Sequence, residues 1–183
     1  MTTTRREQIL DTAATLFAER GFHGVSVHDI GGACGISGPA LYKHFAGKDD
    51  TLTRSLTWIS ERLLTEGRAR SDDAGSTDDA LDALIEWHIE FALGHRALIV
   101  IQEREWGNLG ADGRRDVRAL QLAYIDIWVD TVQHLRDDLD PAEARAVVQA
   151  TFGLLNSTPH SARISEAAMH SRLARMARSA LLA

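Results

Sequence analysis

Apolar residues recur every three or four positions along most of this chain. In residues 5–20, for example, Ile9, Leu10, Ala13 and Phe17 fall on one side of a helix. Similar spacing predicts later helices over 48–70, 77–94, 96–106, 114–138, 140–155 and 164–182. Strand-like alternation of useful length and internal repeats are both missing from the sequence. With two shorter helices between residues 26 and 45, the pattern predicts an all-α fold of about nine helices.

Two short helices separated by a tight turn are predicted between residues 26 and 45. Ser26 can cap the first of them, with Asp29 three residues on. Gly35 then ends it, because glycine tolerates the left-handed conformation that such a turn requires. Ser37 can cap the second helix, and Pro39 fits the first turn, where its missing N–H costs nothing.

The second of these helices has a polar and basic outer face. Leu41 and Phe45 lie four positions apart and face inward, which leaves Tyr42, Lys43 and His44 outside. Two short helices, a glycine turn and such an outer face are typical of a helix-turn-helix that binds DNA. An ordinary helical hairpin is the plain alternative.

Residues 21–52 resemble the DNA-binding signature of the TetR family of bacterial transcriptional regulators. The matching positions are Gly21, Phe22, Gly24, Ser26, Asp29, Ile30, Gly35, Ile36, Ser37, Leu41, Tyr42, His44, Phe45 and Lys48. The resemblance covers about residues 5–52, with Gly32 where the family more often has alanine. It implies a three-helix DNA-binding domain over residues 1–48 and a helical ligand-binding and dimerisation domain over residues 49–183.

The matching positions also indicate how DNA is contacted. Tyr42, His44 and Lys48 are expected to contact phosphates. The backbone and side chains at Gly38, Pro39, Ala40 and Lys43 are expected to approach base edges. Ser26 and Ser37 complete the candidate DNA-binding set. Arg5 and Arg6 precede the first helix and are expected either to reach DNA or to form a frayed basic terminus.

The charge of the chain is unevenly distributed. The net charge is −6, yet residues 1–48 hold five Lys or Arg against four Asp or Glu. The remainder holds fifteen basic and twenty-two acidic residues. An acidic body can be turned away from DNA while a small basic face meets the phosphates. We therefore expect modest non-specific affinity and a homodimer that doubles the contacts.

The sequence carries no motif of an enzyme or a metal site. GxSxG, P-loop and HExxH patterns and a pair of cysteines are all missing, so we expect no catalysis, no cofactor and no metal. His88 and His95 lack a second pair of ligands. The single Cys34 allows no intrachain disulfide, and no run approaches the roughly 18–20 apolar residues of a membrane span. We expect a cytoplasmic protein without membrane contact.

Large side chains are frequent in the C-terminal part, and polar residues interrupt its apolar faces. An apolar wall with a few polar groups is typical of small-molecule sites, although plain core is the alternative for most of these residues. The resemblance implies a cavity there. The candidate lining residues are Trp58, Trp87, His88, Phe91, Gln102, Glu105, Trp106, Tyr124, Trp128, Phe152, Asn156 and His160. Residues 97–109 and 152–161 are also similar to TetR members that respond to acyl-CoA thioesters of fatty acids or steroid fragments.

The sequence thus predicts a ligand-responsive transcriptional repressor that a small apolar effector releases from double-stranded operator DNA. A fatty or steroid acyl-CoA is the first candidate effector. The last two helices are expected to pair across a two-fold axis, with Val148, Phe152, Leu155, Leu173 and Met176 at the dimer interface. Two alternatives stay open: a helical protein-interaction module, and a regulator of drug efflux that responds to lipophilic compounds.

Overall fold

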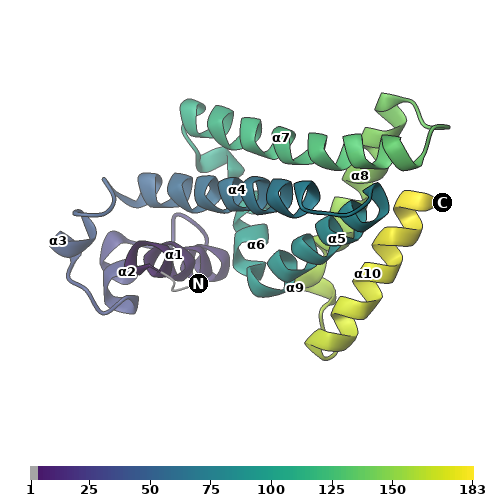
Figure 1. Cartoon of the computed structure of the whole chain (residues 1–183). Coiled ribbons are helices and arrows are strands. Elements are labelled where there is room, and N and C mark those ends of the chain that lie inside the picture. Colours follow the sequence, from purple (N-terminus) through teal and green to yellow (C-terminus); the bar gives the residue numbers. More distant parts are fainter. Residues whose placement is uncertain (1–3) are drawn as a thin grey trace. The chain divides into compact units, whose positions relative to one another are not determined.

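The computed structural model describes residues 4–183, and its all-α architecture confirms the predicted fold class (Figure 1). The first three residues of the predicted 1–48 domain lie outside the described residues. The elements in chain order are α1 (Arg5–Arg20), α2 (Val27–Ala33), α3 (Gly38–Leu41), α4 (Lys48–Asp72), α5 (Thr77–Gly94), α6 (Arg96–Arg104), the 3-10 helix η1 (Trp106–Asn108), α7 (Ala111–Leu135), α8 (Pro141–Leu155), α9 (Thr158–Ser161) and α10 (Glu166–Leu182). Each predicted helix has a counterpart, and α9 is a further single turn at Pro159. None of the described helices is both long and apolar enough to cross a membrane.

The chain divides into two compact units. The first consists of residues 1–59 and 97–117, and the second of residues 60–96 and 118–183. Both α4 and α7 contribute residues to each unit. The first unit therefore holds α1–α3 together with the beginning of α4, α6, η1 and the beginning of α7. The domain boundary at residue 48 stays a prediction.

Capping boxes begin two helices of the first unit. The Thr4 hydroxyl accepts from the Glu7 N–H while the Glu7 carboxylate accepts from the Thr4 N–H. Ser26 and Asp29 form the same reciprocal pair at α2, as the sequence predicted. Behind these caps the helices turn one apolar face inward. The buried apolar residues within residues 4–59 are Ile9, Leu10, Ala13, Ala14, Leu16, Phe17, Phe22, Val25, Ile30, Leu41, Phe45, Leu52, Leu56 and Ile59.

The second unit is built around α10, which packs on α5 and α8. Helix α8 lies where the sequence predicts a helix over 140–155, with an Asp140 cap, Pro141 in the first turn and Glu143 completing the capping box. Arg178 connects α10 to the beginning of α5, because its guanidinium lies 2.7 Å from the Asp78 carboxylate and also contacts Asp82. The apolar core of this unit includes Leu81, Leu84, Ile85, Ile89, Trp128, Val132, Ala144, Val148, Leu155, Leu173, Ala177 and Leu181.

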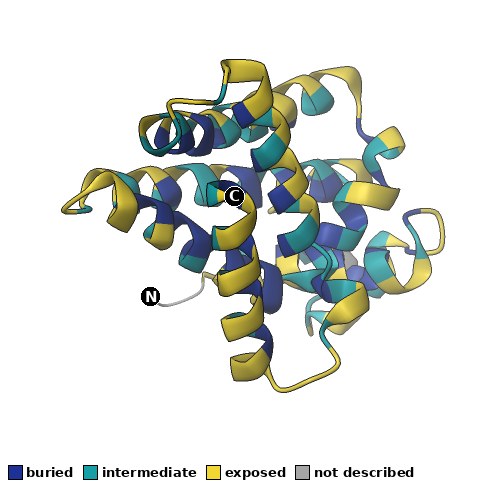
Figure 2. Ribbon diagram, turned by 90° about the vertical axis from the view of Figure 1, so that its right-hand side faces the viewer, coloured by how far each residue is buried: buried dark blue, intermediate teal, exposed yellow. Residues whose placement is uncertain are grey.

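That core includes three residues predicted for the dimer interface. Val148, Leu155 and Leu173 are buried inside the single chain, so their side chains are not available at its surface. Phe152 is half-buried, and Met176 is 51% exposed. The difference in exposure follows from the positions around each helix: Val148, Leu155 and Leu173 lie on the sides of α8 and α10 that face the chain's own core, and Met176 lies on the outer side of α10. The exposed side of α10 lies toward the viewer in Figure 2, where α10 ends at the C mark.

Candidate functional site

The turn between α2 and α3 has the geometry that a helix-turn-helix needs. Gly35 adopts φ +65°, a backbone conformation that residues other than glycine rarely adopt. The Ile36 N–H donates to Gly31 O at 2.9 Å, and the Gly35 N–H donates to Gly32 O at 3.1 Å. These two bonds form a Schellman motif, which ends α2 and redirects the chain. Ser37 then caps α3 by accepting from the Ala40 N–H at 3.3 Å.

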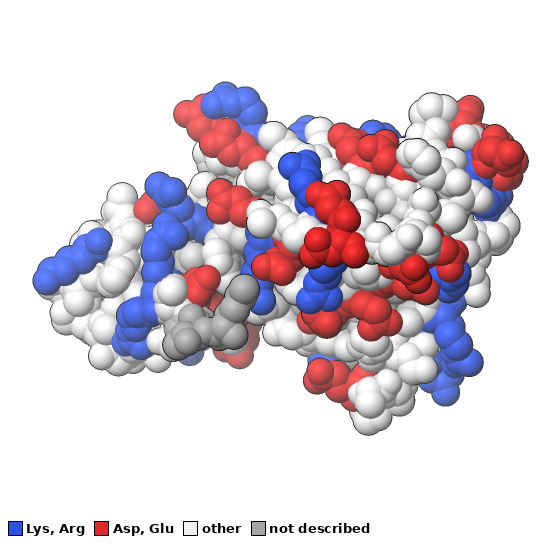
Figure 3. Space-filling view, viewed as in Figure 1, with Lys and Arg blue, Asp and Glu red and all other residues white. Residues whose placement is uncertain are grey.

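The residues after this turn present the predicted outer face. The Phe45 N–H donates to Leu41 O at 3.0 Å, so the helical winding continues past α3. Leu41 and Phe45 are buried, whereas Tyr42 is 58% exposed and Lys43 and His44 are exposed with it. Pro39 is also exposed, and Ala40 is half-buried. In Figure 3, Lys and Arg side chains are spread over the part of the surface that α1–α3 and the beginning of α4 form.

Three of the basic residues near this face are held by the protein itself. Lys48 Nζ donates to Phe22 O at 2.9 Å and lies 4.3 Å from the centroid of the Phe22 ring. The Arg5 guanidinium donates to Cys34 O, the carbonyl of the residue that follows the last residue of α2. Arg6 lies over the Phe45 ring at 5.4 Å. Arg5 and Arg6 therefore contact the helix-turn-helix itself. The sequence had led us to expect either that they reach DNA or that they form a frayed terminus, and neither expectation included this contact.

Ser26 also has a structural role in the described fold. Its hydroxyl and its backbone N–H both donate to the Asp29 carboxylate. The hydrogen bond from the Ser26 side chain, followed by that from its backbone, lowers the pKa of Asp29 below its usual value. The capping pair thus keeps its charge at the N-terminus of α2, where a negative charge is favourable.

Six of the predicted effector residues come together in the second unit. We call the side chains of His88, Phe91, Tyr124, Trp128 and Phe152 the aromatic cluster, and Asn156 lies at its edge. Around the His88 ring, centroid distances run from 4.5 Å to Phe152 up to 5.9 Å to Trp128. Four of the five rings are buried, and Phe152 is half-buried. The cluster draws on α5, α7 and α8.

A hydrogen-bonded chain runs through the aromatic cluster. His88 Nε2 lies 3.1 Å from Asn156 Oδ1, and His88 Nδ1 lies 3.3 Å from the Tyr124 hydroxyl. An amide oxygen only accepts, so His88 Nε2 donates and the Tyr124 hydroxyl donates to Nδ1. Burial lowers the pKa of His88 to about 4, and the Asn156 bond only partly offsets this. Burial also raises the pKa of Tyr124, so both side chains are uncharged at neutral pH.

The other predicted effector residues lie elsewhere. Trp87 Nε1 donates to Leu63 O at 3.2 Å, and the Arg62 and Arg70 side chains lie over its ring. His160 is exposed on α9. Four further residues, Trp58, Gln102, Glu105 and Trp106, belong to the first unit. Trp58 Nε1 donates there to Glu7 Oε1 at 3.2 Å, and the buried Glu105 accepts from Asn108 Nδ2 at 2.8 Å.

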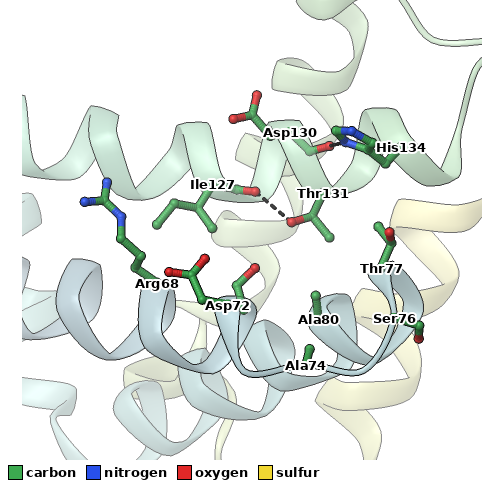
Figure 4. Close-up of a pocket in the computed structure, with 11 residues that line it drawn as sticks. Arg68, Asp72, Ala74, Ser76, Thr77, Ala80, Ile127, Asp130, Thr131 and His134 are labelled. Carbon is green, nitrogen blue, oxygen red and sulfur yellow. Dashed lines mark hydrogen bonds between the residues drawn. The ribbon is translucent and has the colours of Figure 1, made fainter.

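A pocket of about 580 Å³ in the second unit has a different lining (Figure 4). The end of α4, the loop before α5 and one side of α7 form it, with Asp72, Asp130 and His134 among its residues. The Thr131 hydroxyl and the His134 ring turn back onto carbonyls of α7. None of the predicted effector residues lines this pocket. The described residues hold no group of three or more His, Cys, Asp or Glu side chains that fits a metal ion.

A second pocket of about 570 Å³ lies along the exposed side of α8 and α10. Its lining combines apolar Leu154, Met176 and Ala180 with Arg172, Arg175 and Ser179. Leu154 is not among the residues predicted from the sequence, because α8 has apolar residues on more than one side. Only the packing of α10 shows which of them the core leaves outside.

Comparisons with known proteins match both units. A family model for bacterial regulatory proteins of the tetR family covers residues 9–53, and one for tetracyclin repressor-like C-terminal domains covers residues 74–160. The HTH-type transcriptional repressor KstR2 of Rhodococcus jostii is 30% identical over 163 residues, which span 84% of this chain and 76% of the relative. The HTH-type transcriptional regulator UidR of Escherichia coli is 27% identical over 163 residues, which span 82% of this chain and 79% of that one.

Solved structures resemble the whole fold. A TetR-family regulator from Bordetella parapertussis has a TM-score of 0.81 and 25% identity, and the match covers 94% of this chain and 93% of that one. The structure of the ketosteroid transcriptional regulator KstR2 of Mycobacterium tuberculosis has a TM-score of 0.77 and 23% identity, over 98% and 95% of the chains. AibR in complex with isovaleryl coenzyme A and operator DNA has a TM-score of 0.75 and 20% identity, over 94% and 97%. The last two likenesses concern the fold alone.

Proposed function

Because this chain belongs to the TetR family of bacterial transcriptional regulators, we propose that it is a homodimeric repressor that a small apolar effector releases from operator DNA. It is a regulator and not an enzyme. The observation that carries the DNA-binding part is the α2–α3 turn, with its Schellman motif and the exposed Tyr42, Lys43 and His44 beyond it. This arrangement offers a basic side chain to the major groove while the buried Leu41 and Phe45 fix its direction.

The residues of the helix-turn-helix and its flanks divide into those proposed to contact DNA and those that stabilise the fold around it. Tyr42 and His44 are proposed to contact phosphates, and Gly38, Pro39, Ala40 and Lys43 to approach base edges. An ammonium group has three donors, so Lys48 can bind a phosphate while it also donates to Phe22 O. Lys48 then links the DNA backbone to the loop after α1.

Replacing Lys43 by alanine is expected to change which base pair the protein prefers. A lysine that reads a guanine contributes about 1–3 kcal/mol of discrimination. In a gel-shift assay with DNA from upstream of the protein's own coding region, K43A should therefore bind more weakly and discriminate less at one position. Arg118→Ala is the matched control, because it removes an exposed basic residue from α7. If K43A and R118A both bound operator variants as wild type does, Lys43 would not read bases.

Dimerisation is proposed to use the exposed side of α8 and α10. Leu154, Met176 and Ala180 form an apolar strip there, with Arg172 and Arg175 beside it. Two helices from each copy would form a four-helix interface about a two-fold axis. This surface replaces the buried Val148, Leu155 and Leu173 of the sequence-based prediction, and it keeps Met176.

An arginine at Met176 is expected to shift the protein from dimer to monomer. The variant would bring two like charges together in the apolar strip of a two-fold interface, where an unpaired charge is strongly unfavourable. Leu122→Arg is the control, because Leu122 on α7 is also a large exposed apolar residue, 44% exposed against 51% for Met176. Sedimentation velocity at micromolar concentration should show a monomer for M176R and a dimer for L122R. A wild-type monomer, or a dimeric M176R, would contradict the proposed surface.

The effector is proposed to be an acyl-CoA with a fatty or steroid acyl group. Support comes from two sides. The aromatic cluster combines apolar rings, four of them buried, with uncharged polar groups. The similar KstR2 structure is that of a ketosteroid transcriptional regulator, and the similar AibR structure is a complex with isovaleryl coenzyme A and operator DNA.

Helix α4 contributes residues to both units and is held in each. Trp58 ties it to α1 through Glu7, and the Trp87 indole of α5 donates to its Leu63 carbonyl. A shift of α4 is the proposed link between effector and DNA.

A further inference from the structure

Gly67 of α4 allows a very close approach to the aromatic cluster. It is buried, and a Cβ added to it would lie 2.6 Å from Tyr124 Cε2 and 3.2 Å from Tyr124 Cδ2. The first distance is shorter than real Cβ contacts. The edge of the Tyr124 ring therefore lies directly against the backbone of α4. Glycine inside a helix costs about 1 kcal/mol relative to alanine, and this close packing gives a physical reason for its presence here.

The polar groups of the aromatic cluster hold the Tyr124 ring in this place. Its hydroxyl donates to His88 Nδ1 at 3.3 Å, and the other nitrogen of that imidazole donates to Asn156 Oδ1. Burial raises the pKa of Tyr124, while the Trp128 indole N–H and the positive charge of Arg70 oppose this rise. The Tyr124 hydroxyl thus interacts both with the cluster and with a cation of α4.

The same stretch of α4, residues 63–70, is bound by α5. Trp87 Nε1 donates to Leu63 O at 3.2 Å, and the Arg70 guanidinium lies 4.7 Å from the centroid of the Trp87 ring. These contacts hold the stretch against α5. Tyr124 instead limits by steric contact how closely it can approach α7.

A ligand in the aromatic cluster must displace side chains, because four of its five rings are buried. Phe152, the half-buried ring, lies 5.7 Å from the Tyr124 ring and 4.5 Å from the His88 ring. A group that enters beside Phe152 therefore reaches Tyr124 and its hydrogen-bond partner. Protein interiors are close-packed, so a displaced ring moves its neighbours. One neighbour of Tyr124 is the α4 backbone at Gly67.

We propose that Tyr124 transmits effector binding to α4: an effector in the aromatic cluster presses the Tyr124 ring against Gly67 and moves residues 63–70 away from α7. This inference rests on the proposed function and makes it narrower, because it assigns the shift of α4 to one contact. Tyr124 is a positioning residue, since it acts on DNA binding through α4. The same helix begins at Lys48, which is proposed to contact the DNA backbone.

Gly67→Ala is expected to reproduce the effect of the effector. Its methyl group needs the space that the edge of the Tyr124 ring occupies, so α4 and α7 must separate. In fluorescence anisotropy, G67A should bind operator DNA about 5–150-fold more weakly than wild type, the usual range of such coupling. In isothermal titration calorimetry it should bind octanoyl-CoA more tightly, because coupled binding free energies are reciprocal. Damage to the fold alone would weaken both.

Gly94→Ala is the matched control for G67A. Gly94 is exposed at the end of α5, and an added Cβ meets no atom within 4 Å, so G94A should leave both affinities unchanged. Tyr124→Leu removes the ring carbon that the methyl group of G67A meets. The double variant G67A/Y124L should therefore bind operator as Y124L does. Wild-type operator affinity in G67A, or a further loss of affinity from Y124L to G67A/Y124L, would overturn the inference.

The release of operator by saturating octanoyl-CoA provides a second test. It should be largely lost in Y124L and kept in Tyr124→Phe, which retains the ring. Wild-type release in Y124L would overturn the role of Tyr124 and leave an acyl-CoA effector in place. If the wild type did not bind octanoyl-CoA, the proposed effector class would be wrong. The operator affinities of G67A, Y124L and G67A/Y124L would then uphold or overturn the contact between Tyr124 and α4 by themselves.

Discussion

Replacing Gly24 by alanine is expected to destabilise the first unit by about 3 kcal/mol, the upper range for forced overpacking. A Cβ at this position would lie 2.4 Å from the backbone oxygen of Arg20, closer than real Cβ contacts. The obstacle is backbone at the end of α1, so the loop from Gly21 to Gly24 must move. That loop includes Phe22, whose carbonyl holds Lys48, so operator binding should fall as well.

Gly32→Ala is the matched control for G24A. Gly32 is exposed in α2, and a Cβ there meets no atom within 4 Å. Alanine favours a helix over glycine by about 1 kcal/mol, so G32A should be slightly more stable than wild type. Thermal and urea unfolding measured on both variants should therefore move in opposite directions. Equal stability of G24A and G32A would show that the loop relaxes at no cost.

Lowering the pH from 6.5 to 4 is expected to reduce the free energy of unfolding by about 3 kcal/mol, because the unfolded chain binds a proton at His88 that the folded chain does not. Burial lowers the pKa of His88 from 6.5 in the unfolded chain to about 4 in the folded one. Between these values the unfolded state binds the proton and the folded state does not, so stability falls as the pH falls. Above pH 6.5 the imidazole is neutral in both states and this dependence disappears.

The measurement is urea unfolding of the second unit at a series of pH values. His88→Gln lacks the titrating group, so its loss of stability between pH 6.5 and 4 should be smaller than that of wild type by about 3 kcal/mol. His160→Gln is the control, because His160 is exposed on α9 and should leave the wild-type profile unchanged. Parallel profiles for wild type and H88Q would contradict a buried, neutral His88.

The helix-turn-helix was predictable because local signals specify it. Ser26 and Asp29 form a capping box, and Gly35 takes the positive φ that its place in the turn requires. The inward Leu41 and Phe45 follow from a spacing of four. These features depend on residues within a few positions of one another. Both the two helices and their outward side chains were therefore predictable from the sequence.

The two interaction surfaces of the second unit depend on contacts between distant residues. The apolar spacing of α8 and α10 cannot show whether a side chain meets the chain's own core or a second copy, and Leu173 proved to belong to the core. The large side chains of the body likewise appear equivalent in sequence. Only the fold separates Trp128, which is fully buried in the aromatic cluster, from Trp87 and Trp58, whose indoles donate to Leu63 O and to Glu7.

Effector binding and operator release are proposed to be coupled in one protein. The direct measurement is fluorescence anisotropy of labelled operator DNA, bound by the wild-type protein and titrated with octanoyl-CoA. Coupling of this kind is typically about 1–3 kcal/mol, so saturating effector should weaken operator binding about 5–150-fold. The anisotropy should fall over the same concentration range in which calorimetry of the wild-type protein shows octanoyl-CoA to bind. Operator that stays bound with unchanged affinity at saturating octanoyl-CoA would contradict this coupling.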